Sequence, residues 1–288
     1  MGMEIKTADG LGIEILTELT APTSVVFINA LGIPSDITSI LSASLRERGL
    51  SFVTWNLRGS PGSHDGNFRQ YSTRSHIEDL VALVRVLGLR RIVLVGWCSG
   101  IEVALGAVAS GVLRPRGLVL LNSPYFFGDG LYRGVRGDSL HKLSAYIVAN
   151  ENKLSFLYST ILENASQEAE HKLRITDPIL RALVLAPFLN GAQNLLRYAY
   201  LMKNTAGVPA IQQWGRSINL PTRILGGGSD QLVSAEESFA LGQLIDGARV
   251  DIFPDWDHYA LYTHGDEVAA EIAHYAVALT RDPIAADL

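Results

Sequence analysis

The chain has 288 residues, of which 48% are hydrophobic and 18% charged, and its formal net charge is −5. This composition supports a sizeable core and excludes a globally disordered chain, and the mild acidity argues against a protein that binds nucleic acid through a basic face. The sequence shows no apolar run of the about 18 residues that cross a bilayer and no N-terminal secretion signal, so we expect a cytoplasmic protein that does not bind membranes.

Residues 1–127 predict short strands that alternate with helices. The strands are apolar and rich in β-branched residues, and the helices carry their apolar residues on one stripe. Such an alternation favours a parallel sheet with helices on both faces. In chain order we expect a hairpin at 3–19, strands at 25–28, 51–56, 92–95 and 118–122, and helices at 37–48, 75–87 and 99–109.

The alternation stops at about residue 128, where a long helical stretch with polar joints begins. The alternation then resumes with strands at 222–225 and 249–253 and helices at 235–244 and 266–280. We therefore predict an α/β core formed by residues 1–127 and 219–288, with residues 128–218 inserted as a helical cap. The insertion carries 10 Lys and Arg against 7 Asp and Glu, which is typical of a solvated helical surface.

The segment Val93–Gly100 combines a strand, a sharp turn and the start of a helix. Cys98 stands at the centre of the turn, with Gly96 and Gly100 two residues to either side. A strained turn of this kind needs small neighbours and exposes its central side chain above a helix N-terminus, where a thiolate is stabilised. Cys98 is therefore the candidate nucleophile. A buried structural cysteine is the alternative, and Ser99 suits the role less well because it is not centred between the glycines.

This turn resembles the nucleophile elbow of the α/β-hydrolase superfamily, whose motif is Gly-x-Ser-x-Gly, with Cys98 in place of the serine. The resemblance covers most of the chain in element order. It implies the α/β-hydrolase fold, a mostly parallel central sheet flanked by helices, in which residues 128–218 match the variable cap of the family. It also implies that an acid and then a base follow the nucleophile along the chain.

Two later loops match the positions of the acid and the base. Asp230 follows strand 222–225 and corresponds to the acid, and His258 lies in the loop before the final helix and corresponds to the base. His258 would take the proton of the Cys98 thiol, and Asp230 would orient the imidazole. Asp257 is the substitute acid. A turn-forming Asp230 and a surface His258 are the structural alternatives.

The resemblance assigns the oxyanion hole to two backbone N–H groups, which contribute roughly 3 kcal/mol each to transition-state stabilisation. One belongs to Ser99, directly after the nucleophile, and by position the other belongs to Leu31, with Ala30 as the alternative. Trp97 and Tyr125 are candidates for the wall of a substrate pocket, although either suits ordinary core packing equally well.

Three further polar residues are assigned structural roles. Asn29 stands where the family often has histidine, and we expect it to brace its loop. Arg58, within residues 56–63, is expected to fix a tight turn beside the elbow. Glu102 lies in the first turn of helix 99–109, where a carboxylate complements the helix dipole.

A thiol at the elbow favours thioester chemistry. Attack by Cys98 on a thioester exchanges one thioester for another, and a thiolate forms more readily than an alkoxide. The acyl-cysteine stays activated, which predicts thioester hydrolysis, acyl transfer or cyclisation. Within the superfamily the chain is similar to stand-alone thioesterase-like proteins of polyketide and peptide assembly lines.

This resemblance implies an acyl thioester carried on phosphopantetheine as substrate and an acyl or peptidyl carrier protein as partner of the mildly basic cap. The sequence has no phosphate-loop motif, zinc-protease motif or dinucleotide motif, so we expect no cofactor and no metal. Two other functions stay open. One is a Cys-dependent hydrolase of esters or lactones, and the other is a non-catalytic ligand-binding protein on a hydrolase scaffold.

Overall fold

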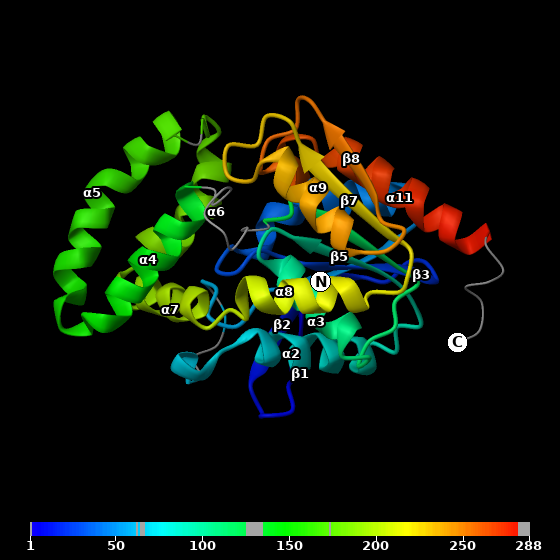
Figure 1. Ribbon diagram of the computed structural model, residues 1–288. Coiled ribbons are helices and arrows are strands. Elements are labelled where there is room, and N and C mark those ends of the chain that lie inside the picture. Colours follow the sequence, from blue (N-terminus) through cyan, green and yellow to red (C-terminus); the bar gives the residue numbers. More distant parts are fainter. Residues whose placement is uncertain (1, 62, 64–66, 125–134, 173, 282–288) are drawn as a thin grey trace.

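A single mixed sheet forms the centre of the molecule in the computed structural model, which describes residues 2–61, 63, 67–124, 135–172 and 174–281 (Figure 1). The sheet order is β1-β2-β4-β3-β5-β6-β7-β8. The pairs β1–β2 and β2–β4 are antiparallel, and the other five pairs are parallel. The strands are β1 (Gly2–Lys6), β2 (Gly12–Glu18), β3 (Thr23–Ile28), β4 (Ser51–Trp55), β5 (Arg91–Trp97), β6 (Gly117–Leu121), β7 (Thr222–Gly227) and β8 (Arg249–Phe253).

Helices cover both faces of this sheet. The α-helices are α1 (Ser39–Glu47), α2 (Thr73–Val86), α3 (Gly100–Ala109), α4 (Val135–Ala149), α5 (Leu154–Lys172), α6 (Pro178–Leu189), α7 (Ala192–Lys203), α8 (Gly207–Ser217), α9 (Ala235–Leu244), α10 (Ala260–Thr263) and α11 (Gly265–Arg281). Short 3-10 helices are η1 (Ser35–Thr38), η2 (Phe68–Gln70) and η3 (Glu151–Lys153). Along β3, Val25 and Phe27 pack towards α1, α10 and α11, whereas Val26 and Ile28 pack towards α2, α3, α8 and α9.

The architecture confirms the predicted α/β-hydrolase fold class. Every strand and helix predicted outside residues 128–218 is present, with ends shifted by a few residues. The sequence missed the one-turn helix α10, because a single turn is too short to show helical periodicity.

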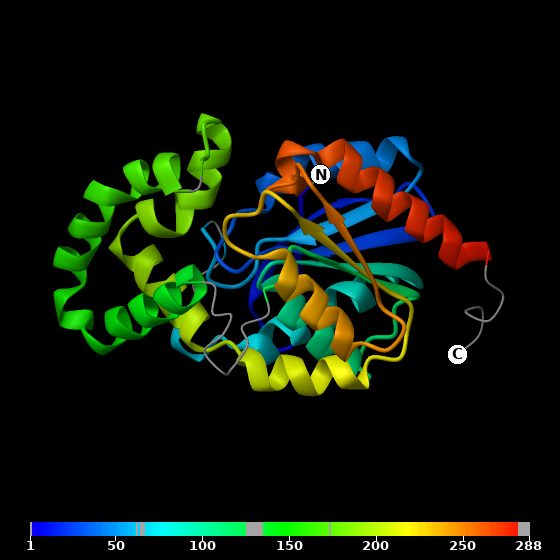
Figure 2. The same cartoon turned by 45° about the horizontal axis from the view of Figure 1, so that its top comes forward.

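The chain between β6 and β7 contains the described helices α4 to α8. In Figures 1 and 2, α4 to α7 lie beyond one end of the sheet, whereas α8 runs alongside α3. Helices α4, α5 and α7 share a small apolar cluster of their own, formed by Ile147, Leu154, Leu195, Leu196 and Ala199. The predicted division into core and cap stays a prediction, and α8, which falls within 128–218, packs against α3 and α9.

Helix α7 packs closely against two glycines in the loops that follow β3 and β4. A Cβ atom on Gly32 would lie 2.5 Å from Cδ2 of Tyr198, and one on Gly59 would lie 2.9 Å from Cδ1 of Leu201. Both glycines also have positive φ angles, 78° in each case. A side chain at either position would therefore push α7 away from the loops that follow β3 and β4.

None of the described helices is by itself long and apolar enough to cross a membrane. Helices α6 and α7 together are long and apolar enough to cross a membrane, but their axes are bent by 85° relative to each other.

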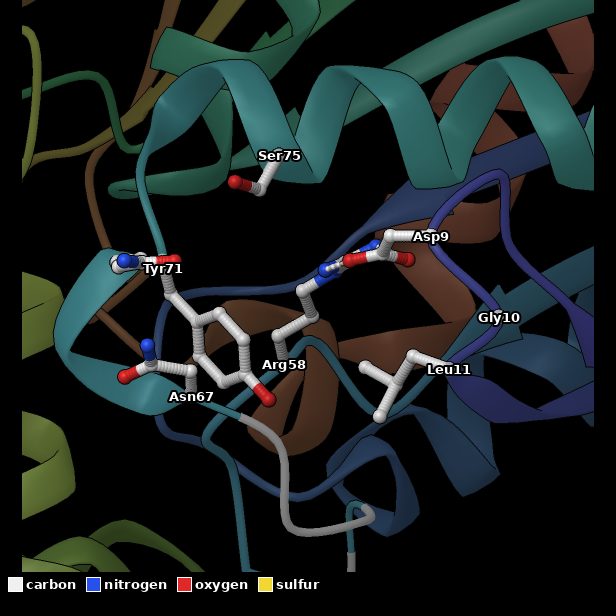
Figure 3. Close-up of a pocket in the computed structure, with 8 residues that line it drawn as sticks. Asp9, Gly10, Leu11, Arg58, Asn67, Tyr71 and Ser75 are labelled. Carbon is white, nitrogen blue, oxygen red and sulfur yellow. Dashed lines mark hydrogen bonds and ion pairs between the residues drawn. The ribbon is translucent and has the colours of Figure 1, made fainter.

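Arg58 is buried between two carboxylates, consistent with the structural role expected for its loop. Its Nε and Nη2 atoms donate to Asp79 on α2 at 2.6 and 2.5 Å. Its Nη1 atom donates to Asp9 at 2.5 Å (Figure 3). The guanidinium also lies 5.5 Å from the centre of the Tyr71 ring. Because Asp9 sits in the turn between β1 and β2, this network ties the N-terminal hairpin to α2.

We expect Asp79→Ala to destabilise the fold by about 3–5 kcal/mol, because it leaves the buried guanidinium of Arg58 without its inner partner. Asp9→Ala is the matched control, since the Asp9 side chain is 58% exposed, and we expect a loss of at most about 1 kcal/mol. Urea unfolding of both variants measures the difference. Equal losses would contradict the assignment of Asp79 as the essential partner.

Candidate active site

Cys98 occupies the turn between β5 and α3 with a backbone that non-glycine residues rarely adopt, at φ 50°. Its N–H donates to the carbonyl oxygen of Leu121 on β6 at 3.0 Å. The flanking glycines allow the close packing: a Cβ atom on Gly96 would lie 2.9 Å from Cα of Ile101, and one on Gly100 would lie 2.4 Å from the carbonyl oxygen of Ile28. The thiol is partly exposed at the N-terminus of α3, the environment that stabilises a thiolate.

The structure brings His258 and Asp230 together beside this turn. Nδ1 of His258 lies 2.8 Å from Oδ2 of Asp230, and the His258 residue is only 4% exposed. The indole N–H of Trp97 donates to the carbonyl oxygen of His258 at 3.0 Å, and the Trp97 and His258 rings are 5.6 Å apart. The backbone and the ring of His258 are therefore both held in place.

Asp230 accepts four hydrogen bonds, so its orientation is fixed. Besides His258, Oδ2 accepts from Nδ2 of Asn122 at 2.9 Å, and Oδ1 accepts from the N–H groups of Leu232 and Val233 at 2.7 and 2.9 Å. The sequence reasoning assigned no role to Asn122, which has a φ of 49° directly after β6. Its place at the carboxyl end of a strand next to β5 was the available signal.

The electrostatics of the group favour a charged histidine. Burial alone would lower the pKa of His258, but Asp230 and Cys98, through their charges and through hydrogen bonds, raise it well above its ordinary value. Burial would raise the pKa of Asp230, but the charge of His258 and the hydrogen bonds from His258, Val233 and Leu232 lower it below its ordinary value. Asp230 and Cys98 together therefore favour the imidazolium form of His258.

Hydrogen bonds in the loop after β3 distinguish Ala30 from Leu31, the two candidates for the second oxyanion donor. The N–H of Ala30 donates to the side chain of Asn29 at 3.0 Å, and Nδ2 of Asn29 bonds to the carbonyls of Ile33 and Pro34. Asn29 therefore braces the loop, and Ala30 is already engaged by it. The N–H of Leu31 donates to Oγ of Ser99 at 2.9 Å, which places it next to the elbow.

The three remaining candidate residues are Trp97, Tyr125 and Asp257. Trp97 is only 1% exposed, and its ring packs against the His258 ring. Tyr125 lies outside the described residues. Asp257, the substitute acid, accepts from the N–H of Tyr259 and from the hydroxyl of Thr263, so its carboxylate caps a turn and does not contact His258 through a hydrogen bond.

Glu102 does more than complement the dipole of its own helix. Its carboxylate accepts from the hydroxyl of Thr73 and from the N–H groups of Ala206 and Gly207, at 2.5 and 3.1 Å for the two backbone groups. It therefore links α2, α3 and the start of α8, and it remains outside the proposed chemistry.

Two described cavities differ in what lines them. The larger, about 460 Å³, lies at Arg58 and is bordered by the β1–β2 turn and Tyr71 (Figure 3), but the positive charge there is already neutralised by Asp9 and Asp79. The smaller, about 190 Å³, lies beside His258 and Tyr259. Among the described residues, no group of three or more His, Cys, Asp or Glu side chains is arranged to hold a metal ion.

Comparison with known proteins identifies the family. Residues 23–265 match the family described as alpha/beta hydrolase fold, and since this match spans most of the chain, the chain belongs to that family. No curated protein matches the sequence.

Several solved structures share the fold at low sequence identity. An esterase from Exiguobacterium antarcticum has 17% identity and a TM-score of 0.75, and the match covers 96% of this chain and 100% of that one. A thermophilic esterase from Thermogutta terrifontis has 18% identity and a TM-score of 0.74, covering 97% and 99%. The enol-lactonase from Burkholderia xenovorans LB400 has 15% identity and a TM-score of 0.71, covering 96% and 100%.

We expect Asp230→Asn to lower the pKa of His258, because the charge of Asp230 is the main influence that raises it. The thiolate would then lose its imidazolium partner, and alkylation of Cys98 by iodoacetamide at pH 7 should slow by about tenfold or more. An NMR titration of His258 and the pH profile of alkylation measure both effects. Asp257→Asn is the matched control, and a larger change in that variant would identify Asp257 as the partner.

Proposed function

We propose that this member of the α/β-hydrolase family processes acyl thioesters through an acyl-Cys98 intermediate. The observation that carries the proposal is the Cys98 thiol at the strained elbow, whose charge acts on the His258 ring, while Nδ1 of that ring lies 2.8 Å from Oδ2 of Asp230. A nucleophile, a base and an orienting acid in this arrangement are the requirements for covalent acyl transfer.

The acylation step follows from this arrangement. The Cys98 thiolate attacks the thioester carbonyl carbon, and the carbonyl oxygen becomes an oxyanion that accepts from the N–H groups of Ser99 and Leu31. Because the Leu31 N–H donates to the Ser99 hydroxyl in this structure, the oxyanion would replace that hydroxyl as acceptor. The intermediate then collapses, the bond to the leaving sulfur breaks, and the His258 imidazolium protonates the departing thiolate.

Deacylation reverses the proton path. Neutral His258 takes a proton from water, an alcohol or an amine as that nucleophile attacks the acyl-Cys98 carbonyl, and then returns the proton to the Cys98 sulfur when the acyl group leaves. The product is an acid, an ester or an amide, or a ring when the nucleophile belongs to the acyl chain.

A carrier protein is part of the same proposal. An acyl thioester on phosphopantetheine would present its carbonyl to Cys98 while the carrier rests on the helices between β6 and β7. The net positive charge of residues 128–218, 10 Lys and Arg against 7 Asp and Glu, suits an acidic carrier.

Hydrolysis of an oxygen ester or lactone by the same thiol is the second candidate. It is favoured by the similarity to structures named as esterases and as an enol-lactonase. The two candidates differ in the leaving group, because a thiolate is displaced by Cys98 at nearly no energetic cost, whereas an alkoxide needs protonation by His258.

Incubation with a panel of N-acetylcysteamine acyl thioesters should add one acyl mass to the intact protein. Cys98→Ala should abolish the adduct, and His258→Ala should slow its formation by about 100-fold or more. His264→Ala is the matched control, since His264 lies outside the site and contacts Thr263. Ligand binding without any adduct across the panel would support a non-catalytic binding protein instead.

Matched pairs of substrates distinguish thioester processing from ester hydrolysis. For an acyl thioester and the oxygen ester of the same acyl group, we expect kcat/KM to favour the thioester by at least about 100-fold. The rate of release of the leaving thiol or alcohol measures this ratio. A ratio near one, or faster turnover of a lactone, would favour the second candidate.

A further inference from the structure

Ser99, the residue after the nucleophile, uses its hydroxyl unlike most serines at the start of a helix. It is the N-cap of α3, where a serine oxygen ordinarily accepts from an N–H group in the first turn. Among the described residues this capping bond is absent. The N–H of Ile101 donates instead to the carbonyl oxygen of Cys98 at 3.0 Å. The N–H of Glu102 donates to the carbonyl oxygen of Ser99 at 3.3 Å, so the start of α3 does not depend on the Ser99 hydroxyl.

The Ser99 oxygen bonds to the loop after β3 instead. It accepts from the N–H of Leu31 at 2.9 Å. This N–H is one of the two donors assigned to the oxyanion, and a good hydrogen bond needs its acceptor close to the N–H direction. The hydroxyl oxygen therefore occupies the position in which the oxyanion would accept the same bond.

The loop that carries the Leu31 N–H is held in place on both sides of that residue. Before it, the side chain of Asn29 makes three buried hydrogen bonds to backbone groups of the loop. After it, the ring of Tyr198 packs on Gly32, where a Cβ atom would lie 2.5 Å from Cδ2 of the ring. Leu31 itself is only 5% exposed. The direction of its N–H is therefore fixed by the packing of the loop.

The hydroxyl is the part of this contact that can move. Ser99 is partly exposed, and its oxygen changes position by rotation about the single Cα–Cβ bond, from one staggered rotamer to another. This rotation releases the Leu31 N–H without any shift of the backbone. The bond that is lost joins two neutral groups, whereas the bond to an oxyanion is charge-assisted and stronger.

The charge of the acceptor decides when the exchange is favourable. The carbonyl oxygen of a bound substrate is a neutral acceptor like the hydroxyl, so it gains little by displacing it. The oxygen of the tetrahedral intermediate carries a full negative charge and gains the stronger bond. A water molecule in the same position would be immobilised at an entropic cost, which the tethered hydroxyl does not incur. The hydroxyl is therefore a stronger competitor than water.

We propose that the Ser99 hydroxyl fills the oxyanion position in the free protein, and that its rotation opens the oxyanion hole when the intermediate forms at Cys98. The hydroxyl satisfies the Leu31 N–H between turnovers, and it lowers the rate of acylation by the cost of the displaced hydrogen bond. The inference rests on the proposed acylation of Cys98 and assigns a role to a further side chain of the same site.

The test compares two reactions of the same thiol. An N-acetylcysteamine acyl thioester reacts with Cys98 through an oxyanion, whereas iodoacetamide alkylates the sulfur at a saturated carbon and forms none. The measured quantity is the ratio of the rate constant of acylation to that of alkylation, both followed by intact mass at pH 7. A change in the nucleophilicity of the thiol cancels in this ratio.

Four variants isolate the hydroxyl. Ser99→Ala and Ser99→Gly remove it, and we expect the ratio to rise about threefold to tenfold, as for the loss of one competing neutral hydrogen bond. Glycine is also well tolerated at an N-cap. Ser99→Thr retains the hydroxyl, so its ratio should stay at or below the wild-type value. Ser110→Ala is the matched control at the other end of α3, where the Ser110 hydroxyl donates to the carbonyl oxygen of Gly106 at 2.7 Å, and its ratio should not change.

The outcomes separate this inference from the proposed function. If Cys98 is acylated but the ratio is unchanged or falls in Ser99→Ala and Ser99→Gly, the hydroxyl does not block the oxyanion hole, and the proposed function still stands. A rise in Ser99→Thr as well would assign the effect to altered packing and overturn the inference. If the wild type is alkylated but no thioester acylates it, the proposed function fails and the inference fails with it. Thermal unfolding shows which variants retain the fold.

Discussion

The backbone of Cys98 is the constraint on which the rest of the site depends. A left-handed conformation at a non-glycine residue is retained only where the surroundings fix it. Here Gly96 and Gly100 allow α3 to pack directly against β5 and the end of β3, and the N–H of Cys98 is tied to β6. The thiol is consequently presented at the edge of the sheet where the loops after β3, β6, β7 and β8 meet.

Each of those loops contributes a side chain or a backbone N–H group to the candidate site. The loop after β3 holds the Leu31 N–H, and Asn122 after β6 and Asp230 after β7 meet at one carboxylate. His258 after β8 completes the group. Because the strands are parallel, their carboxyl ends share one edge, and residues distant in sequence become neighbours there.

The sequence was informative where a residue type and a turn motif coincide. The glycines around Cys98, and Asp230 and His258 at the ends of strands, could be identified from motif and chain order. Asn122 and Tyr198 could not, because asparagine after a strand is a common turn residue and a tyrosine on α7 resembles any apolar helix position. Their importance arises only when α7 and β6 are placed beside the elbow, which depends on tertiary packing.

The seating of α7 on Gly32 and Gly59 has a consequence for exchange of the inserted helices. The absence of a side chain at Gly32 and Gly59 sets how closely α7 can pack against the two loops. A transplanted segment with bulkier residues at 198 or 201, or a recipient with alanine at either glycine, would hold α7 farther from the loops after β3 and β4. Such chimeras should therefore take Gly32, Gly59 and α7 from the same parent protein.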